Sequence, residues 1–236
     1  MKGLINAVGN EDSLGKSRSS EIRGLIQFGG KSLVEHILQK LEEGNIGETL
    51  ILTNPSHENR YRSKLAKKGN KVIIVPYSGN QDPLAVYLTG ALMLEDDAFI
   101  VADDNLFDFS IAPMIEMFKK VQGSVLATLP LQRIIEGSTE DLNFGTCLVG
   151  EDGKISEASY SFDASTKLDS SQKVVLDLYA VHRNQIAQAK NIAEQGVGGL
   201  AAAWYSGFYA WEPKDGFWAD IGKAPLRTKA ESYFNK

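Results

Sequence analysis

The sequence predicts a single α/β domain built on a mainly parallel sheet with helices on both faces. The first half of the chain alternates short apolar runs with amphipathic segments of helical period, which is the order expected of strands and crossover helices. The chain has 236 residues, of which 43% are hydrophobic and 23% charged, enough to enclose one sizeable core. We therefore expect one domain over residues 1–236.

The first elements are a strand, a long loop and a helix. Leu4–Val8 is a short apolar run that predicts a buried strand, and the polar Gly9–Ser20 stretch predicts a long loop. Ser32 stands three residues before Glu35, which is the pattern of a capping box. Apolar residues then recur at helical spacing until Gly44, so we expect a helix between these points.

Strands and helices continue to alternate up to Pro130. Asp82 and Pro83 form an N-cap and first-turn pair for a helix that reaches about Leu94. The other elements expected in this part are the strands Thr49–Thr53, Val72–Val75, Ala98–Ala102 and Ser124–Leu129 and the helices His57–Lys68 and Ile111–Val121. Ligands of such sheets bind at the carboxyl ends of the strands, where we expect the site.

The pattern changes after Pro130. A hairpin is expected from Gly145–Val149 and Lys154–Ser159, which flank a turn sequence. Beyond it the sequence predicts the strand Val174–Val181 and the helices Asn184–Glu194 and Lys223–Phe234. An aromatic cluster falls between these helices, and core packing or a subunit contact explains it better than base stacking; its members are Trp204, Tyr205, Phe208, Tyr209 and Trp211.

Composition excludes several classes of protein. The net charge is −5 with scattered basic residues, so nucleic acid is not an expected partner. Cys147 is the only cysteine, which excludes an internal disulfide and favours a reducing, cytoplasmic location. No apolar stretch approaches the length of a membrane span, so no membrane partner is expected. The three histidines are too isolated to indicate a zinc site or a triad; they are His36, His57 and His182.

Three segments resemble sugar-1-phosphate nucleotidyltransferases such as glucose-1-phosphate thymidylyltransferases. They are the Lys2–Gly9 segment, the Gly29–Leu33 helix start and the Ala102–Phe107 segment, and the order matches over nearly the whole chain. The resemblance implies a Rossmann-like fold of the nucleotide-diphospho-sugar transferase type. It also implies a nucleotide-binding half over residues 1–130 and an acceptor half over residues 131–236, with transfer from an NTP to a sugar-1-phosphate or related phosphorylated acceptor.

The resemblance implies a Mg²⁺ site made by Asp104 and Asp220. Asp104 takes the place of the aspartate in the family's Gly-Asp-Asn segment, and Asp220 that of the aspartate in its Trp-x-Asp-x-Gly segment. Mg²⁺ prefers oxygen ligands and is usually held by one or two carboxylates plus substrate phosphates. Asp103, beside Asp104, fits either a metal ligand or a turn former.

The other site residues follow from the same resemblance. Arg23 takes the place of the family's catalytic lysine. The residues implied at the nucleotide are Asn6, Ala7, Gly9, Ser13, and Ser78 or, with a shifted loop, Gln81. The residues implied at the acceptor are Gly145, Tyr179 and Trp218.

The sequence departs from the family at the groups that hold phosphate. Glu11, Asp12 and Ser13 replace the Gly-Thr-Arg that wraps the triphosphate, and two carboxylates there repel phosphate oxygens. The acceptor segments Glu-Lys-Pro and Asn-Ala-Gly fall on Tyr160–Phe162 and Val175–Asp177. We therefore expect the loop at 9–20 not to hold a triphosphate as family members do.

Two main hypotheses remain open, and a weaker third. The first is an active, Mg²⁺-dependent nucleotidyltransferase, and the second is a non-catalytic relative that binds a nucleotide or sugar nucleotide or serves as a regulatory subunit. The third is a different α/β binding domain that resembles the family by chance. The sequence leaves the base, the acceptor and assembly into a homo-oligomer undetermined.

Overall fold

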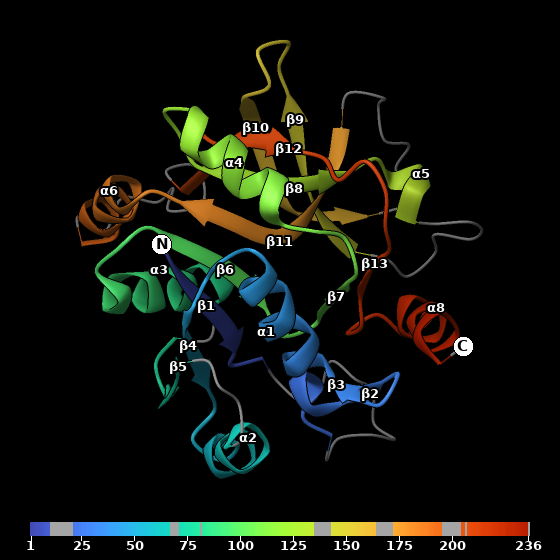
Figure 1. Cartoon of the computed structure of the whole chain (residues 1–236). Helices are drawn as coiled ribbons and strands as arrows, with labels where there is room; N and C mark the ends of the chain where they lie inside the picture. The colour runs from blue at the N-terminus through green and yellow to red at the C-terminus, as the bar shows by residue number, and fades with distance from the viewer. Residues whose placement is uncertain are drawn as a thin grey trace.

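The computed structural model describes residues 1–9, 21–66, 71–80, 82–134, 143–163, 172–194, 204–205 and 207–235. Within these ranges the predicted α/β architecture is confirmed, because helices cover both faces of one large sheet (Figure 1). Seven of its strands run in the order β10-β9-β11-β6-β1-β4-β5; β8 pairs with β11, and β12 pairs with β8. The altered loop segment Glu11–Ser13 lies outside the described residues.

The N-terminal half builds the parallel part of the sheet. Strand β1 pairs in parallel with β4 and β6, and β4 pairs in parallel with β5. The bounds are β1 Lys2–Ala7, β4 Glu48–Thr53, β5 Lys71–Pro76 and β6 Ala98–Ala102. Leu4 and Ile5 are fully buried and belong to the cores on opposite faces, which explains why this uniformly apolar strand lies inside the sheet.

The C-terminal half adds mostly antiparallel strands. Strand β11 runs antiparallel to β6, β8 and β9, and β9 and β10 form the predicted hairpin. The bounds are β8 Val125–Leu129, β9 Asn143–Val149, β10 Ile155–Asp163, β11 Gln172–Val181 and β12 Tyr209–Trp211. This half therefore widens the parallel sheet instead of forming a separate sheet.

The helices divide between the two faces of the sheet. Residues of α1, α2, α4 and α8 belong to one core cluster, and residues of α3 and α6 belong to the other. The bounds are α1 Leu33–Glu43, α2 Glu58–Leu65, α3 Pro83–Leu94, α4 Ala112–Lys120, α5 Leu131–Ile134, α6 Arg183–Glu194 and α8 Ala224–Phe234. Trp204, Tyr205 and Phe208 are buried in the α3/α6 core, so core packing explains this part of the aromatic cluster.

The predicted helix starts are confirmed in atomic detail. The Ser32 N–H donates to Glu35 Oε2 at 2.9 Å, which is the return contact of the capping box at α1. Asp82 Oδ1 accepts hydrogen bonds from the N–H groups of Leu84 and Ala85 at 3.0 and 3.3 Å, and Pro83 opens α3. Local sequence therefore fixes where these helices begin.

Short strands outside the main sheet were not predicted. Strands β2 (Gln27–Phe28) and β3 (Lys31–Ser32) form a small hairpin before α1. Strands β7 (Asn105–Phe107) and β13 (Trp218–Asp220) pair antiparallel, and α8 lies beside β13 (Figure 1). Among the residues that the structure describes, no helix has the length and apolar character that a membrane span requires.

Candidate active site

The two-stranded β7–β13 sheet brings Asp104 and Asp220 together. Asp104 immediately precedes β7, and Asp220 ends β13 opposite Asn105. The Ile221 N–H donates to the Asp104 carbonyl oxygen at 2.8 Å. Both carboxylates border the same space, because a methyl group added at Gly222 would lie 3.0 Å from Asp220 Oδ1 and 3.9 Å from Asp104 Oδ2. The structure thus joins the two aspartates at the carboxyl end of β6.

The ionised form of Asp220 is electrostatically disfavoured. Burial and the negative charge of Asp104 raise the pKa of Asp220 to about 6. Lys223 Nζ lies 3.2 Å from Asp220 Oδ2 and partly offsets this effect. The pair therefore favours cations, which is the property expected of carboxylates that hold a metal ion.

Arg23 reaches this site from the other side. It begins the short 3₁₀ helix η2 (Arg23–Leu25), and its Nη1 donates to Asp104 Oδ2 at 2.9 Å. The side chain is only 13% exposed, and a methyl group added at Gly9 would lie 1.2 Å from Nη2. The other oxygen of Asp104, Oδ1, accepts a hydrogen bond from Asn105 Nδ2 at 3.0 Å. Arg23 and Asp104 therefore form one unit with the end of β1.

Asp103 has a different role from its neighbour. Its Oδ2 accepts hydrogen bonds from Tyr61 Oη at 2.7 Å and from the Gly24 N–H at 3.2 Å, and the residue is 4% exposed. Burial raises the pKa of Asp103, and the nearby Arg23 charge opposes that rise. Asp103 thus anchors the η2 segment and α2 to the end of β6. It is the structural member of the Asp103–Asp104 pair.

The residues predicted to bind the nucleotide differ in how close they lie to the site. Asn6 and Ala7 end β1; Asn6 Oδ1 accepts a hydrogen bond from the Val8 N–H at 3.1 Å, and Ala7 is buried. Gly9 lies against Arg23, whereas Ser78 is exposed after β5. Ser13 and Gln81 lie outside the described residues. Among the described members of this set, Gly9 lies against Arg23, and Asn6 and Ala7 stand just before it at the end of β1.

A cavity of about 210 Å³ opens beside Asp220. It is lined by Pro83, Asn105, Phe144, Gly145, Val175, Asp177, Tyr205, Trp218, Asp220 and Lys223. Gly145 and Trp218, both predicted at the acceptor, are therefore gathered with one of the predicted metal ligands. Sequence reasoning missed Tyr205 and Lys223 as lining residues. The position of Lys223 three residues after Asp220 was the only signal for it.

Trp218 is fixed as one wall of this cavity. Its indole Nε1 donates to Asn105 Oδ1 at 2.7 Å across the β7–β13 pair. The Phe144 ring centroid lies 6.2 Å from that of Trp218, and Lys223 Nζ lies 5.2 Å from the Phe144 centroid. The cavity therefore combines aromatic faces with carboxylates and one ammonium group.

Tyr179, predicted to contact the acceptor, lies behind the cavity instead. It is fully buried in the α3/α6 core and is not one of the lining residues. Its Oη donates to Asp177 Oδ1 at 2.5 Å and lies 3.3 Å from Tyr205 Oη. Tyr179 thus supports two residues that do line the cavity.

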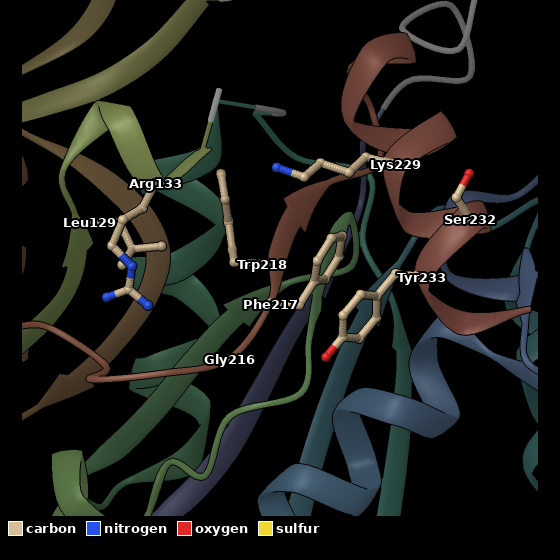
Figure 2. Close-up of a pocket in the computed structure, with 8 residues that line it drawn as sticks. All are labelled: Leu129, Arg133, Gly216, Phe217, Trp218, Lys229, Ser232 and Tyr233. Carbon is tan, nitrogen blue, oxygen red and sulfur yellow. The ribbon is translucent and has the colours of Figure 1, made fainter. Parts of the chain in front are cut away.

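A larger cavity of about 530 Å³ shares Trp218 with the smaller one, and Figure 2 shows the residues that line it. It is lined by Leu129, Arg133, Gly216, Phe217, Trp218, Lys229, Ser232 and Tyr233. None of these is a carboxylate, and Arg133 Nη1 already donates to the Pro213 carbonyl oxygen at 2.5 Å. Of the two cavities, the smaller one is therefore the one that carries carboxylates, Asp177 and Asp220.

Comparison with known proteins identifies the family of this chain. The family model described as nucleotidyl transferase matches residues 19–231, so the match begins after the Glu11–Ser13 segment. No curated protein matches the sequence.

Two solved structures share the fold. One is described as a glucose-1-phosphate thymidylyltransferase from Bacillus anthracis in complex with a sucrose; it has a TM-score of 0.81 and 19% identity, over 100% of this chain and 96% of that chain. The other is a UDP-glucose pyrophosphorylase complexed with UDP-glucose, with a TM-score of 0.75 and 15% identity over 99% and 97% of the two chains.

Proposed function

Because this chain belongs to the nucleotidyl transferase family, we propose that it moves a nucleotidyl group from an NTP to a sugar-1-phosphate or related phosphorylated acceptor. A phosphate oxygen of the acceptor attacks the α-phosphorus, a new P–O bond forms, and the bond to the β-phosphate breaks as pyrophosphate leaves. The observation that carries the proposal is the convergence of Asp104, Asp220 and Arg23, of which Asp220 lines the 210 Å³ cavity.

The carboxylate pair suits Mg²⁺. Asp104 and Asp220 offer oxygen ligands around one space, and burial together with the charge of Asp104 raises the pKa of Asp220, so a nearby cation would favour its ionised form. Across the described ranges, no group of three or more acidic, histidine or cysteine side chains gathers as a metal site, so phosphates would have to complete the coordination. When bound, Mg²⁺ would supply charge neutralisation at the phosphates.

The cationic side chains have separable tasks in this proposal. Arg23, whose guanidinium lies against Gly9, can exchange its contact with Asp104 for a contact with the nucleotide phosphates. Lys223, which lies on the cavity and pairs with Asp220, can hold the acceptor phosphate. Trp218 and Gly145 border the acceptor, with glycine allowing close approach of the backbone.

A second candidate function is binding without catalysis. It is favoured by Glu11, Asp12 and Ser13 in place of the family's phosphate-binding residues, and by the ion pair that already occupies Asp104. In that case the chain binds a nucleotide or sugar nucleotide, or acts as a regulatory subunit. The cytoplasmic location and a homo-oligomer remain predictions under both functions.

Pyrophosphate release with each of the four NTPs, glucose 1-phosphate or other phosphorylated acceptors, and Mg²⁺ tests the transfer reaction. We expect turnover with at least one pair and its loss in Asp104→Asn, while Asp152→Asn, on the exposed β9–β10 turn, keeps activity. Binding of Mn²⁺ measured by electron paramagnetic resonance should weaken in Asp104→Asn as well. Ligand-induced stabilisation by an NTP without turnover of any acceptor would instead support the non-catalytic function.

A further inference from the structure

Asp177 has a left-handed backbone conformation at the irregular register of β11 between Val175 and Tyr179. Its φ is 52°, in the left-handed region, although it lies within strand β11. The other described non-glycine residues with positive φ, Asn45 and Glu95, both lie at helix ends, where this conformation is common. Glycine would take the conformation at position 177 without steric cost. Strained residues of this kind concentrate at functional sites.

The negative charge of the ionised Asp177 carboxyl is also poorly balanced by positive charge in the cavity wall. It lines the 210 Å³ cavity, and Tyr179 Oη donates to its Oδ1. Burial, followed by the charges of Asp104 and Asp220, raises the pKa of Asp177 to about 7. Lys223 is the one cation among the described lining residues, and it pairs with Asp220 at 3.2 Å. The cavity therefore holds two carboxylates for one ammonium group.

The rest of the cavity wall suits a cation. Phe144, Tyr205 and Trp218 present aromatic side chains to it, and Lys223 Nζ already lies 5.2 Å from the Phe144 ring centroid. Aromatic faces and a carboxylate together attract ammonium groups, whereas an additional phosphate or carboxylate near Asp177 would be repelled. Asp177 is not part of a three-carboxylate metal group within the described part of the chain, so a metal ligand is not its indicated role.

We propose that Asp177 is a specificity-determining residue that selects an acceptor bearing a protonated amine in addition to its phosphate. The inference rests on the proposed function and narrows its acceptor class. The amine pairs with the Asp177 carboxylate, which Tyr179 orients from behind the cavity, and the aromatic walls surround it. Lys223 remains the group for the phosphate.

Equilibrium binding of matched compounds tests this assignment. Calorimetry with Mg²⁺ present would compare glucosamine 1-phosphate with glucose 1-phosphate, and phosphoethanolamine with ethyl phosphate. We expect the amine-bearing member of at least one pair to bind about tenfold more tightly, since a charge-assisted hydrogen bond in a partly dry site has roughly that effect. The two pairs also distinguish an amino sugar from a simple amino alcohol.

Two variants of Asp177 test the assignment without disturbing the fold. Asp177→Asn removes the charge and tolerates a positive φ, and Asp177→Gly removes the carboxyl with the least backbone strain. Both should reduce the amine preference to about one while the protein still binds Mn²⁺. A preference that survives in both variants, equal binding within both pairs, or no binding of either amine at millimolar concentration overturns the proposal.

Pyrophosphate release measured in parallel separates this inference from the proposed function. An amine preference that depends on Asp177 but occurs without turnover supports the selectivity and contradicts the transfer reaction. Turnover that is indifferent to the amine and to Asp177→Asn supports the reaction and contradicts the selectivity.

Discussion

Arg23 Nη1 donates to Asp104 Oδ2 at 2.9 Å, while Arg23 Nη2 lies 3.9 Å from Asp103 Oδ1. One guanidinium group thus pairs with two consecutive carboxylates at the end of β6. The arginine is largely buried, and among the described residues it is the cation that lies within ion-pair distance of both carboxylates. The stability of the empty protein and the chemistry of the site therefore depend on the same side chain.

Replacing Arg23 by alanine should destabilise the protein strongly. The variant leaves Asp103 and Asp104 without their guanidinium, and removing one partner of a buried ion pair costs about 3 kcal/mol. Arg62→Ala is the control, because Arg62 pairs with Glu58 at 2.8 Å but is 53% exposed, and exposed pairs contribute below about 1 kcal/mol. Urea unfolding measures both. Equal losses in the two variants would show that burial of the Arg23 pair has no energetic effect.

Gly9→Ala should disturb the Arg23–Asp104 ion pair, because the Gly9 backbone lies against the Arg23 guanidinium. The new methyl group would lie 1.2 Å from Arg23 Nη2, so the guanidinium must move away from Asp104. We expect a loss of about 1–2 kcal/mol, whereas Gly47→Ala, which has no atom within 4 Å, should change stability by less than about 0.5 kcal/mol. In an Arg23→Ala background the effect of Gly9→Ala should disappear. A full effect in that background would contradict the contact.

Trp218→Phe should lower the free energy of unfolding more than Trp204→Phe does, because the Trp218 variant loses a buried hydrogen bond. The Trp218 indole donates to buried Asn105 at 2.7 Å, so its loss leaves an unsatisfied amide oxygen and costs about 1–3 kcal/mol. Trp204 is also buried, but its Nε1 has no acceptor among the described residues, so removing it relieves an unpaired donor and offsets some lost packing. Chemical denaturation compares the two variants. A larger loss for Trp204→Phe would contradict this ranking.

Asp177→Asn should stabilise the protein at alkaline pH. The pKa of Asp177 is raised to about 7 in the folded state, so the unfolded chain ionises this group more readily, and its contribution to stability is lost as pH rises from about 4 to 7. The variant avoids that loss. Solvent in the cavity reduces the full effect, and we expect a gain of about 2 kcal/mol at pH 8.

The gain in stability from Asp177→Asn should vanish near pH 4, where the wild-type carboxyl is largely protonated in both the folded and the unfolded state. Asp152→Asn is a control of opposite sign, because the backbone N–H and side chain of Lys154 lower the pKa of Asp152. Melting temperatures between pH 4 and 8 follow both variants. A constant difference between Asp177→Asn and the wild type across this range would exclude titration of Asp177 as the cause.

Elements that depend on local signals were predictable from the sequence. The capping box at Ser32 and the Asp82-Pro83 pair marked the starts of α1 and α3 correctly. Strands β1 and β6 followed from continuous apolar runs. These signals act over a few residues, so they can be recognised without knowledge of the tertiary structure.

The features that sequence reasoning missed depend on distant contacts. Strands β7 and β13 have three residues each and exist because they pair with one another. Tyr179 was placed at the acceptor, but β11 carries an irregular register between Val175 and Tyr179, and the ring lies in the core. Asp177 was identified only as a departure from the family. Its left-handed conformation and its place on the cavity wall are visible only in the fold.

The β7–β13 pairing has a consequence for the order of synthesis and folding. It joins Asn105 and Trp218, which are 113 residues apart, and it carries Asp220 to Asp104. The central strands β1, β4, β5 and β6 can pair once the first 102 residues have been made. The second carboxylate arrives only once the chain has been made as far as Asp220 and a long loop has closed. A nascent chain on the ribosome can therefore build the parallel sheet early, yet it acquires its complete carboxylate pair only more than a hundred residues later.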